Sequence, residues 1–226
     1  MWLSDVFTSY ELECKTRDLF HVYRENKNLI FDKFEECFGI SYKLAFGNKD
    51  PNLGIYDLLE EYYPNEYYIK RAFSKKYLKN NKTIYEYPVF DSRADIINVN
   101  GSLSCYEIKT KYDNLDRINK QIKDYSKVFE YIYVVCSEDK LLEVKKIIPK
   151  YCGIISYKDR KKCAFCKKRG AKKSPDFEID SILRCFNKNE LEKCFNTKSI
   201  KKINNLYKDK EIISNYKAVL CKRYFA

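Results

Sequence analysis

The sequence predicts an α/β protein with helical additions before and after its sheet. Short apolar runs of strand length lie between residues 84 and 157, and helical apolar spacing separates the later runs. Both ends of the chain show only helical spacing, and 226 residues with 45% apolar content can bury a core. We expect a helical region over 1–63, an α/β core over 64–157, and a basic linker with a small helical region over 158–226.

The N-terminal region is predicted to form helices separated by breaks. Apolar residues recur at helical spacing from Leu19 to Phe38, and Gly39 follows as a stop signal. The stretch FGNKDPNLG, residues 46–54, is typical of a loop, and a short helix is expected over 55–62.

From Pro64 the pattern indicates a helix, three strands, a helix, a strand, a helix and a strand. The continuous apolar run YIYVVC is typical of a strand covered on both faces. The predicted strands are Ile84–Phe90, Ala94–Val99, Leu103–Lys109, Tyr131–Cys136 and Gly153–Tyr157. The predicted helices are 65–80, 115–129 and Leu141–Ile148.

Beyond residue 157 the chain becomes strongly basic. The stretch KDRKKCAFCKKRGAKK has nine basic residues and one acid, Asp159, and two short helical patterns follow over 178–186 and 188–195. This stretch is either a solvated flexible segment or a contact surface for phosphates. In the second case the phosphate-binding candidates are Lys161, Lys162, Lys167, Lys168 and Arg169.

Composition narrows the classes of function. A formal charge of +12 favours a polyanionic partner such as nucleic acid, or serves solubility alone. The single histidine, His21, argues against Ser-His-Asp catalysis and against zinc sites built on several imidazoles. Chemistry at this protein therefore has to rest on carboxylates, lysine, hydroxyls or thiols.

The cysteines and the hydropathy indicate a cytoplasmic protein without a membrane partner. The ten cysteines are scattered through apolar patterns, which suits reduced thiols. The pair Cys163 and Cys166 forms a lone CxxC that fits no familiar zinc module well. No apolar run approaches the ~20 residues of a membrane span, and MWLSDVFTSYELECKTR lacks the apolar core of a signal peptide.

Asn100-Gly101 lies between two apolar runs and predicts a β-hairpin. The length of the hairpin loop decides which charged side chains converge, because facing alternates along a strand. A two-residue loop would leave Asp95 on the face opposite to Glu107. A three-residue loop with Gly101 as a bulge would place Asp95 on the face of Glu107 and Lys109. If Asp95, Glu107 and Lys109 act together on one face, the hairpin must have the bulged loop. We therefore predict that Asn98 pairs with Ser102.

Two carboxylates on one face can share a hard cation such as Mg²⁺, and a nearby lysine can orient an attacking water. Glu-x-Lys alone has little value, because it occurs five times in this chain. Only Glu107 and Lys109 lie in a strand of an apolar hairpin with an acid on the partner strand. The alternative is an edge strand with one solvated, salt-bridged face.

The segment RADIINVNGSLSCYEIKT, followed by Asp113-x-Leu115-x-Arg117 and Gln121-x-x-x-Tyr125, resembles the PD-(D/E)xK nuclease superfamily. Within it, the segment is similar to a small bacterial and phage family of largely unassigned role. The resemblance covers roughly residues 65–157 and implies a restriction-endonuclease-like core. One departure is Ala94, which stands where the motif has its nominal proline.

The resemblance also implies roles for individual residues. It makes Asp95, Glu107 and Glu66 candidate metal ligands and Lys109 the catalytic lysine. Glu66 would lie in the first core helix, although a first-turn acid favoured by the helix dipole is the alternative.

On the helix that follows the Glu-x-Lys strand, Gln121 and Tyr125 would share a face with Arg117 and look onto the site and a substrate phosphate. A core aromatic is the alternative for Tyr125. Glu86 is expected to be a solvated strand residue rather than a further ligand.

The function that the resemblance implies is a Mg²⁺-dependent nuclease, with Mn²⁺ as a substitute, that hydrolyses phosphodiester bonds of DNA. A phage or mobile-element setting goes with it. The rival from another class is a catalytically silent protein of the same fold that binds nucleic acid or a protein partner. A DNA-binding regulator built on residues 178–195 is disfavoured, because no helix-turn-helix signature is present.

Overall fold

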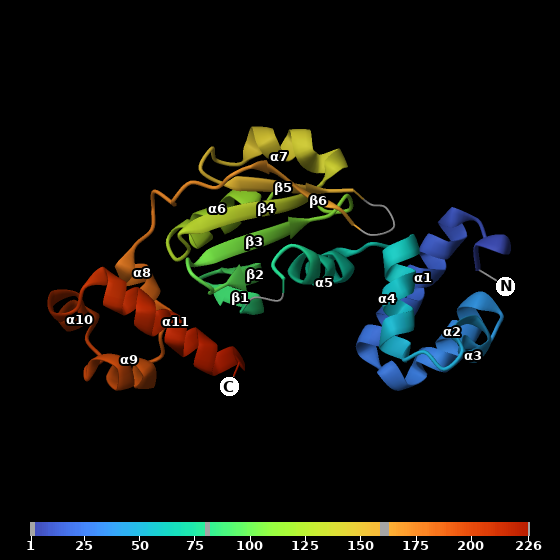
Figure 1. The fold of residues 1–226 in the computed structure, drawn as a ribbon, viewed down its shortest axis with the longest axis horizontal. Coiled ribbons are helices and arrows are strands. Elements are labelled where there is room, and N and C mark those ends of the chain that lie inside the picture. The colour runs from blue at the N-terminus through green and yellow to red at the C-terminus, as the bar shows by residue number, and fades with distance from the viewer. Residues whose placement is uncertain (1–2, 80–81, 159–162, 226) are drawn as a thin grey trace. The chain divides into compact units, whose positions relative to one another are not determined.

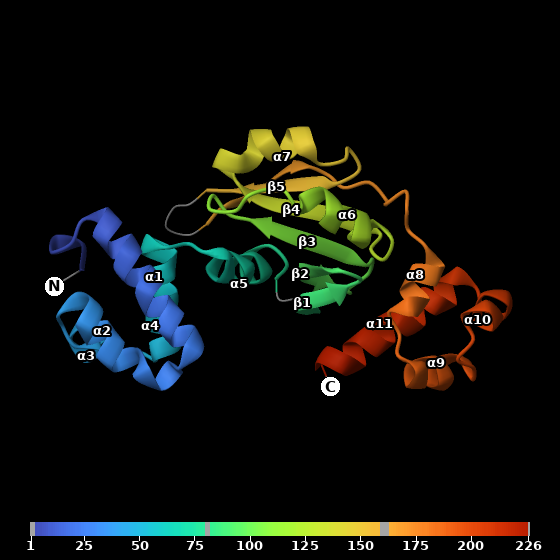
Figure 2. The same cartoon turned by 180° about the vertical axis from the view of Figure 1, so that it is seen from behind.

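The computed structural model describes residues 3–79, 82–158 and 163–225. The chain divides into two compact units, one of residues 1–69 with 159–163 and the other of residues 70–158 with 164–226. Their elements are labelled in Figures 1 and 2. The first unit is helical and the second contains a mixed sheet, so the predicted α/β class with helices at both ends is confirmed.

The first unit consists of α-helices with short 3-10 turns at its start and between the first two. The α-helices are α1 (Ser9–Glu25), α2 (Ile30–Phe38), α3 (Tyr42–Phe46) and α4 (Pro51–Tyr62). Gly39 ends α2 at φ +69°, as predicted. The predicted loop over 46–54 is too long, because Asp50 caps α4 and Pro51 occupies its first turn.

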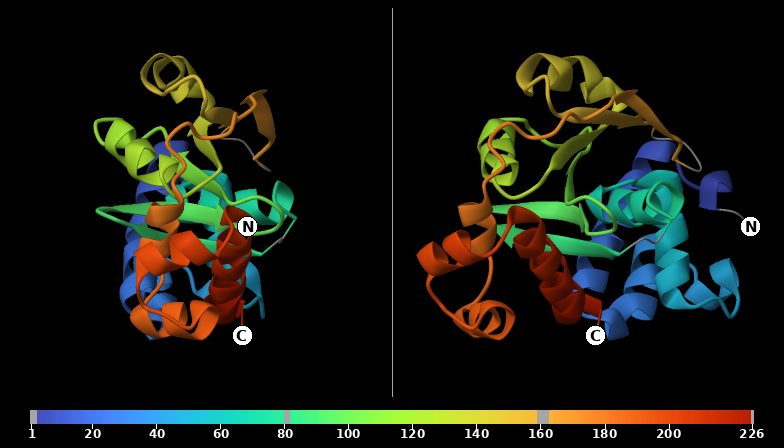
Figure 3. Two further views of the ribbon diagram at one scale, coloured as in Figure 1. Left: turned by 90° about the vertical axis from the view of Figure 1, so that its left-hand side faces the viewer. Right: turned by 60° about the vertical axis from the view of Figure 1, so that its left-hand side comes forward.

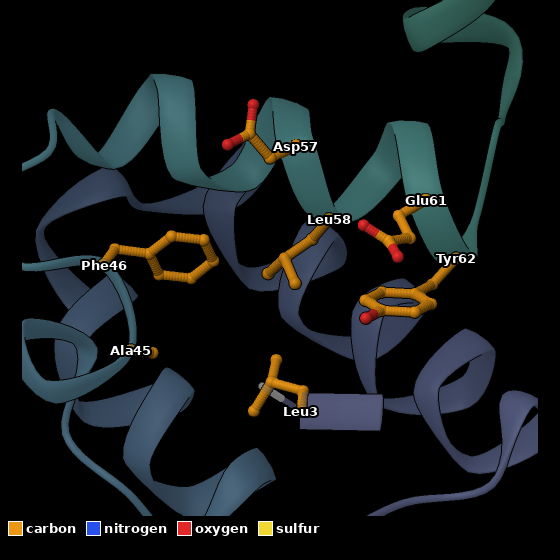
Figure 4. A pocket seen from close by; sticks show the side chains of 7 residues that line it. All are labelled: Leu3, Ala45, Phe46, Asp57, Leu58, Glu61 and Tyr62. Atoms are coloured by element: carbon orange, nitrogen blue, oxygen red, sulfur yellow. The ribbon is translucent and has the colours of Figure 1, made fainter. Parts of the chain in front are cut away.

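The core of the first unit is aromatic. The Phe34 ring contacts those of Phe38, Tyr42 and Phe46. Figure 4 shows a pocket beside this core, with a cavity volume of only about 10 Å³. It is lined by Leu3, Ala45, Phe46, Asp57, Leu58, Glu61 and Tyr62. Such a cavity has room for about one water molecule.

Within the described part of the second unit, the sheet has six strands in the order β1-β2-β3-β4-β5-β6. Its two central pairs, β3–β4 and β4–β5, are parallel, and the remaining pairs are antiparallel. The strands are β1 (Thr83–Val89), β2 (Ser92–Asn98), β3 (Ser104–Lys109), β4 (Tyr131–Ser137), β5 (Gly153–Tyr157) and β6 (Phe165–Arg169). Strand β6 was not predicted, since it lies in the basic stretch.

Helices cover both faces of the sheet. The helices concerned are α5 (Glu66–Lys76), within which the boundary between the units falls, α6 (Ile118–Ser126) and α7 (Leu141–Ile147). Phe73 of α5 packs on Tyr106, while Ile118 of α6 shares a core with Cys105. Because Tyr106 and Cys105 are neighbours in β3, these two helices lie on opposite faces.

Of the described residues, those after β6 form four further helices, which are visible in both views of Figure 3. They are α8 (Ile179–Arg184), α9 (Lys188–Phe195), α10 (Ile200–Leu206) and α11 (Asp209–Phe225). Their apolar side chains join the core beneath β1, where the Tyr216 and Tyr87 hydroxyls lie 2.7 Å apart. Within the described ranges, no helix has the length and hydropathy of a membrane span.

The β2–β3 hairpin differs from both predicted loops. Asn98 pairs with Ser104, so the connection is five residues long, and Gly101 within it has φ +79°. The two strands separate before the predicted turn, because the Leu103 backbone is hydrogen-bonded to residues outside the hairpin. Its N–H donates to a Glu130 carboxylate oxygen at 2.8 Å, and its carbonyl accepts from the N–H of Tyr131. The register is shifted by two residues from that of the bulged loop, which preserves the facing of the side chains.

Candidate active site

Asp95 lies where β2 and β3 part. Their pairing ends at Ile96 and Tyr106, and beyond this point the Asp95 Oδ2 atom accepts a hydrogen bond from the N–H of Ile108 at 2.6 Å. The carboxylate thus replaces a main-chain acceptor of the neighbouring strand, and the side chain is buried. An aspartate held in this way has one fixed position, and its Oδ1 atom is left for other partners.

Glu107 is the most deeply buried charged residue of the site, at 2% exposure. Its Oε1 atom accepts from Lys109 Nζ at 2.9 Å and from Gln121 Nε2 at 2.6 Å. Lys109 also donates to Gln121 Oε1 at 3.1 Å. The Glu-x-Lys pair is therefore closed into a ring of hydrogen bonds by one side chain from α6.

Tyr125 approaches the other oxygen of Glu107. Its hydroxyl lies 2.9 Å from Glu107 Oε2 and 2.7 Å from the carbonyl oxygen of Arg93. A tyrosine has one proton, so it donates to one of these acceptors at a time. Gln121 and Tyr125 are four residues apart and share a helix face, as predicted. Arg117 immediately precedes α6 and is exposed.

The electrostatics of the site follow from burial. Burial raises the pKa of Glu107, and Lys109, Tyr125 and Gln121 only partly oppose this effect. Burial and the charge of Glu107 together raise the pKa of Tyr125, so this hydroxyl remains a donor. If Glu107 is protonated, its O–H donates to the Tyr125 oxygen. The Tyr125 hydroxyl then donates to the Arg93 carbonyl, so that both acceptor atoms are satisfied.

Lys70 of α5 belongs to the site, although the sequence analysis did not single it out. Its Nζ atom lies 2.8 Å from Asp95 Oδ1 and also pairs with Glu86 Oε1, and its side chain is 11% exposed. The available signal was its position one helical turn after Glu66 in NEYYIK.

Glu66 begins α5, the continuous helix that carries Lys70. Within the second unit, Glu86 and Asp95 both pair with the Lys70 ammonium group. Glu86 was expected to be solvated. It is exposed and has a φ of +53° within β1, and its carboxylate pairs with Lys70. Glu107 pairs with Lys109 instead.

The phosphate-binding candidates of the basic stretch lie in different surroundings. Lys161 and Lys162 lie outside the described residues. In β6, Lys167 is exposed, whereas Lys168 lies 3.4 Å from Glu138. Arg169 holds β6 in place by donating to the carbonyls of Cys152 and Pro149 at 2.7 and 3.0 Å. The ten cysteines lie among the described residues, and none of them forms a disulfide bond.

Together, the fold and these side chains define an α/β protein with a buried acid–lysine site where two strands part. Residues 61–225 match the family model described as Bacteriophage P4 protein cII, so the chain belongs to that family. The similarity that the sequence showed to a small phage family is thereby confirmed.

The named relatives cover parts of the chain. Protein cII of Enterobacteria phage P4 is 32% identical over 91 residues, which are 39% of this chain and 34% of that protein. The chain therefore matches about a third of the length of this relative. A solved structure of a protein of unknown function from Silicibacter pomeroyi is 12% identical and covers 46% of this chain and 70% of its own. Its TM-score of 0.37 is too low to support an inference.

Proposed function

We propose that this protein is a Mg²⁺-dependent nuclease with a restriction-endonuclease-like core that hydrolyses phosphodiester bonds of DNA. The observation that carries the proposal is the buried hydrogen-bonded set of Glu107, Lys109, Gln121 and Tyr125 beside Asp95. Buried charges are costly unless they are paired, and they concentrate at functional sites.

The potential metal-ligating atoms of the site suit a hard cation such as Mg²⁺, because they are carboxylate oxygens. The carboxylates of Asp95 and Glu86 both pair with Lys70 Nζ and therefore lie near one another. Glu107 accepts from three donors and, with about four lone-pair positions, keeps capacity for one further bond. Mg²⁺ bound here would lower the pKa of a water and offset negative charge on the phosphate.

The reaction requires a water oxygen to bond to phosphorus while the bond from phosphorus to the leaving sugar oxygen breaks. The water loses one proton, and the leaving oxygen gains one. Lys109 would orient the attacking water, since Glu107 and Gln121 hold its ammonium group in place. Tyr125 and Gln121 would keep the Glu107 carboxylate in one orientation.

The distribution of charge supports a polyanionic substrate. Residues 70–226 contain 37 basic and 19 acidic residues, whereas residues 1–69 contain 7 basic and 13 acidic ones. The positive excess thus lies entirely in the part of the chain that carries the sheet, where it would attract nucleic acid.

Cleavage assays of Asp95→Asn and Lys109→Ala test the proposal. We expect each to lower the rate about 100-fold or more, because each removes a group that acts on the reacting atoms. The substrates are single-stranded, duplex and branched DNA and RNA, each with Mg²⁺, Mn²⁺ or chelator.

Lys145→Ala is the matched control, since Lys145 belongs to another Glu-x-Lys and is exposed on α7. Variants at Asp95 and Lys109 that cut as well as the parent would show that the assignment is wrong.

The rival function, a silent fold that binds nucleic acid or a protein, has one observation in its favour. Lys70 places an ammonium group between Asp95 and Glu86, where it already neutralises two candidate ligands. A parent protein that binds nucleic acid but cuts none of these substrates with either metal would support the rival.

A further inference from the structure

The turn between β1 and β2 presents an unusual phenylalanine. Val89 pairs with Ser92, so Phe90 and Asp91 form a two-residue turn, and Phe90 has φ +52°. Bulky side chains are disfavoured in this left-handed region, where glycine is the usual choice. The Phe90 side chain is nevertheless 45% exposed. A large ring kept in a strained, exposed position indicates a role in binding another molecule rather than in stabilising the fold.

The turn contacts α6 through two side chains. Ser92 donates to Asp124 Oδ2 at 2.6 Å, and the Lys127 ammonium lies 5.5 Å from the centre of the Phe90 ring. Lys120, Lys123 and Lys127 are three and four residues apart, so they lie along one face of the helix. An exposed aromatic ring thus lies beside a helix face that carries three lysines.

The turn and the candidate active site are connected through β2 and α6. Ser92 begins β2, and Asp95 follows three residues later, about 10 Å along the strand. On the other side, α6 carries Tyr125, whose hydroxyl contacts both Arg93 and Glu107. A strand bound at the turn would therefore lie within a few nucleotides of the site.

We propose that Phe90 and the lysines of α6 form a binding site for single-stranded nucleic acid. A base stacks on the Phe90 ring, and Lys120, Lys123 and Lys127 contact the adjoining phosphates. This inference rests on the proposed function and names the strandedness of its substrate. A duplex does not satisfy the site, because its bases are already stacked on one another.

Two acidic groups lie at the same surface. Asp124 is half-buried and accepts the hydrogen bond from Ser92. Asp91 is 84% exposed and lies 3.7 Å from Lys120, so the pair is weak and Lys120 stays available to a phosphate. Asp91→Asn removes a charge that repels phosphate, and this variant should bind more tightly than the parent.

Fluorescence anisotropy of the full chain with a short labelled oligothymidylate, in chelator, tests the proposal. Phe90→Gly should lower affinity between about fivefold and a hundredfold, whereas Phe90→Tyr keeps the ring and should keep the affinity. The melting temperature of Phe90→Gly should equal or exceed that of the parent, because glycine relieves the backbone strain. Loss of binding therefore cannot be attributed to unfolding.

Phe31→Ala is the control, because Phe31 is a similarly exposed phenylalanine, at 51%, in the acidic first unit. It should leave the affinity unchanged. Equal affinities of the parent and Phe90→Gly, an equal loss in Phe31→Ala, or tighter binding of a matching duplex would each overturn the proposal. A parent that binds the single strand but never cuts it would refute only the nuclease function, whereas cleavage with unaltered binding by Phe90→Gly would refute only this inference.

Discussion

Glu107 shows how a buried carboxylate makes stability depend on pH. Burial raises its pKa above the ordinary value of 4.5, so the folded state favours the protonated form more than the unfolded chain does. The stabilising contribution of Glu107 is therefore complete below pH 4.5 and is lost as the pH rises through the raised, folded-state pKa. Above its folded-state pKa, the buried carboxylate is charged, and this charge costs stability.

Glu107→Gln tests this linkage. Glutamine keeps the size of the side chain and cannot ionise. The free energy of unfolding of the variant therefore lacks this dependence on pH. We expect the free energy of unfolding of the variant, minus that of the parent, to increase as the pH rises from about 4 to 7. Urea denaturation at a series of pH values measures the difference.

Glu143→Gln is the control for this experiment, because Glu143 is an exposed residue of α7. Its difference from the parent should change little over the same pH range. A Glu107→Gln difference that is constant or decreases with pH would contradict a raised pKa.

The sequence predicts some residues of the site and misses others for physical reasons. Asp95, Glu107 and Lys109 could be found because charges in apolar strands break a local pattern. Lys70 could not, since it is one of many lysines in the chain and contacts a strand 25 residues later. The position of Glu86 depends on its φ of +53°, which no alternation rule predicts.

At the scale of elements, one ion pair joins α9 to α11. Arg223 Nε donates to Glu190 Oε1 at 2.7 Å, and an Nη2 N–H donates to the carbonyl of Cys185 at 3.0 Å. Glu190 also completes the capping box of α9 with Asn187. The hydrogen bonds from Arg223 are the main cause of a lowered pKa at Glu190. Its contribution is therefore present above the ordinary carboxyl pKa and lost as the pH falls.

Arg223→Gln should reduce stability by about 1 kcal/mol at neutral pH, because it removes charge-assisted hydrogen bonds from a partly exposed pair. The loss should shrink as the pH falls through the lowered pKa of Glu190, where the carboxylate becomes protonated in the parent as well. Urea denaturation at pH 7 and at lower pH gives both values. Lys222→Gln, at an exposed position of the same helix, should have little effect at either pH. A loss that persists at low pH would mean that Arg223 acts through packing.

Strand β6 shows why elements of this kind escape prediction. Its sequence FCKKR has no apolar alternation, and its side chains are largely exposed. The strand exists because its backbone pairs with β5 and because Arg169 binds two carbonyls near the start of that strand. The buried strands β4 and β5 have continuous apolar runs, and their bounds were predicted to within a residue. Edge strands held by backbone contacts carry little sequence signal.

At the scale of the whole molecule, charge is divided along the chain. The 13 acidic and 7 basic residues of 1–69 would repel nucleic acid, and the 37 basic and 19 acidic residues of 70–226 would attract it. Overall composition conceals this division, because the two segments partly cancel in the net charge of +12. The total charge alone therefore does not say which part of the molecule binds.

The salt dependence of binding locates the charges that contact phosphate. Each such lysine releases counterions on binding a single strand and contributes about 0.7 to the slope of log affinity against log salt. The double variant Lys120→Gln, Lys123→Gln should therefore reduce the slope by about 1.4, whereas Lys43→Gln, in the acidic segment, should leave it unchanged. Anisotropy titrations over a range of NaCl concentrations, in chelator, give these slopes.

Phe90→Gly should lower the affinity at every salt concentration without altering the slope, because stacking releases no counterions. Equal slopes for the parent and the double lysine variant would exclude α6 as the phosphate contact, even if the protein binds nucleic acid elsewhere.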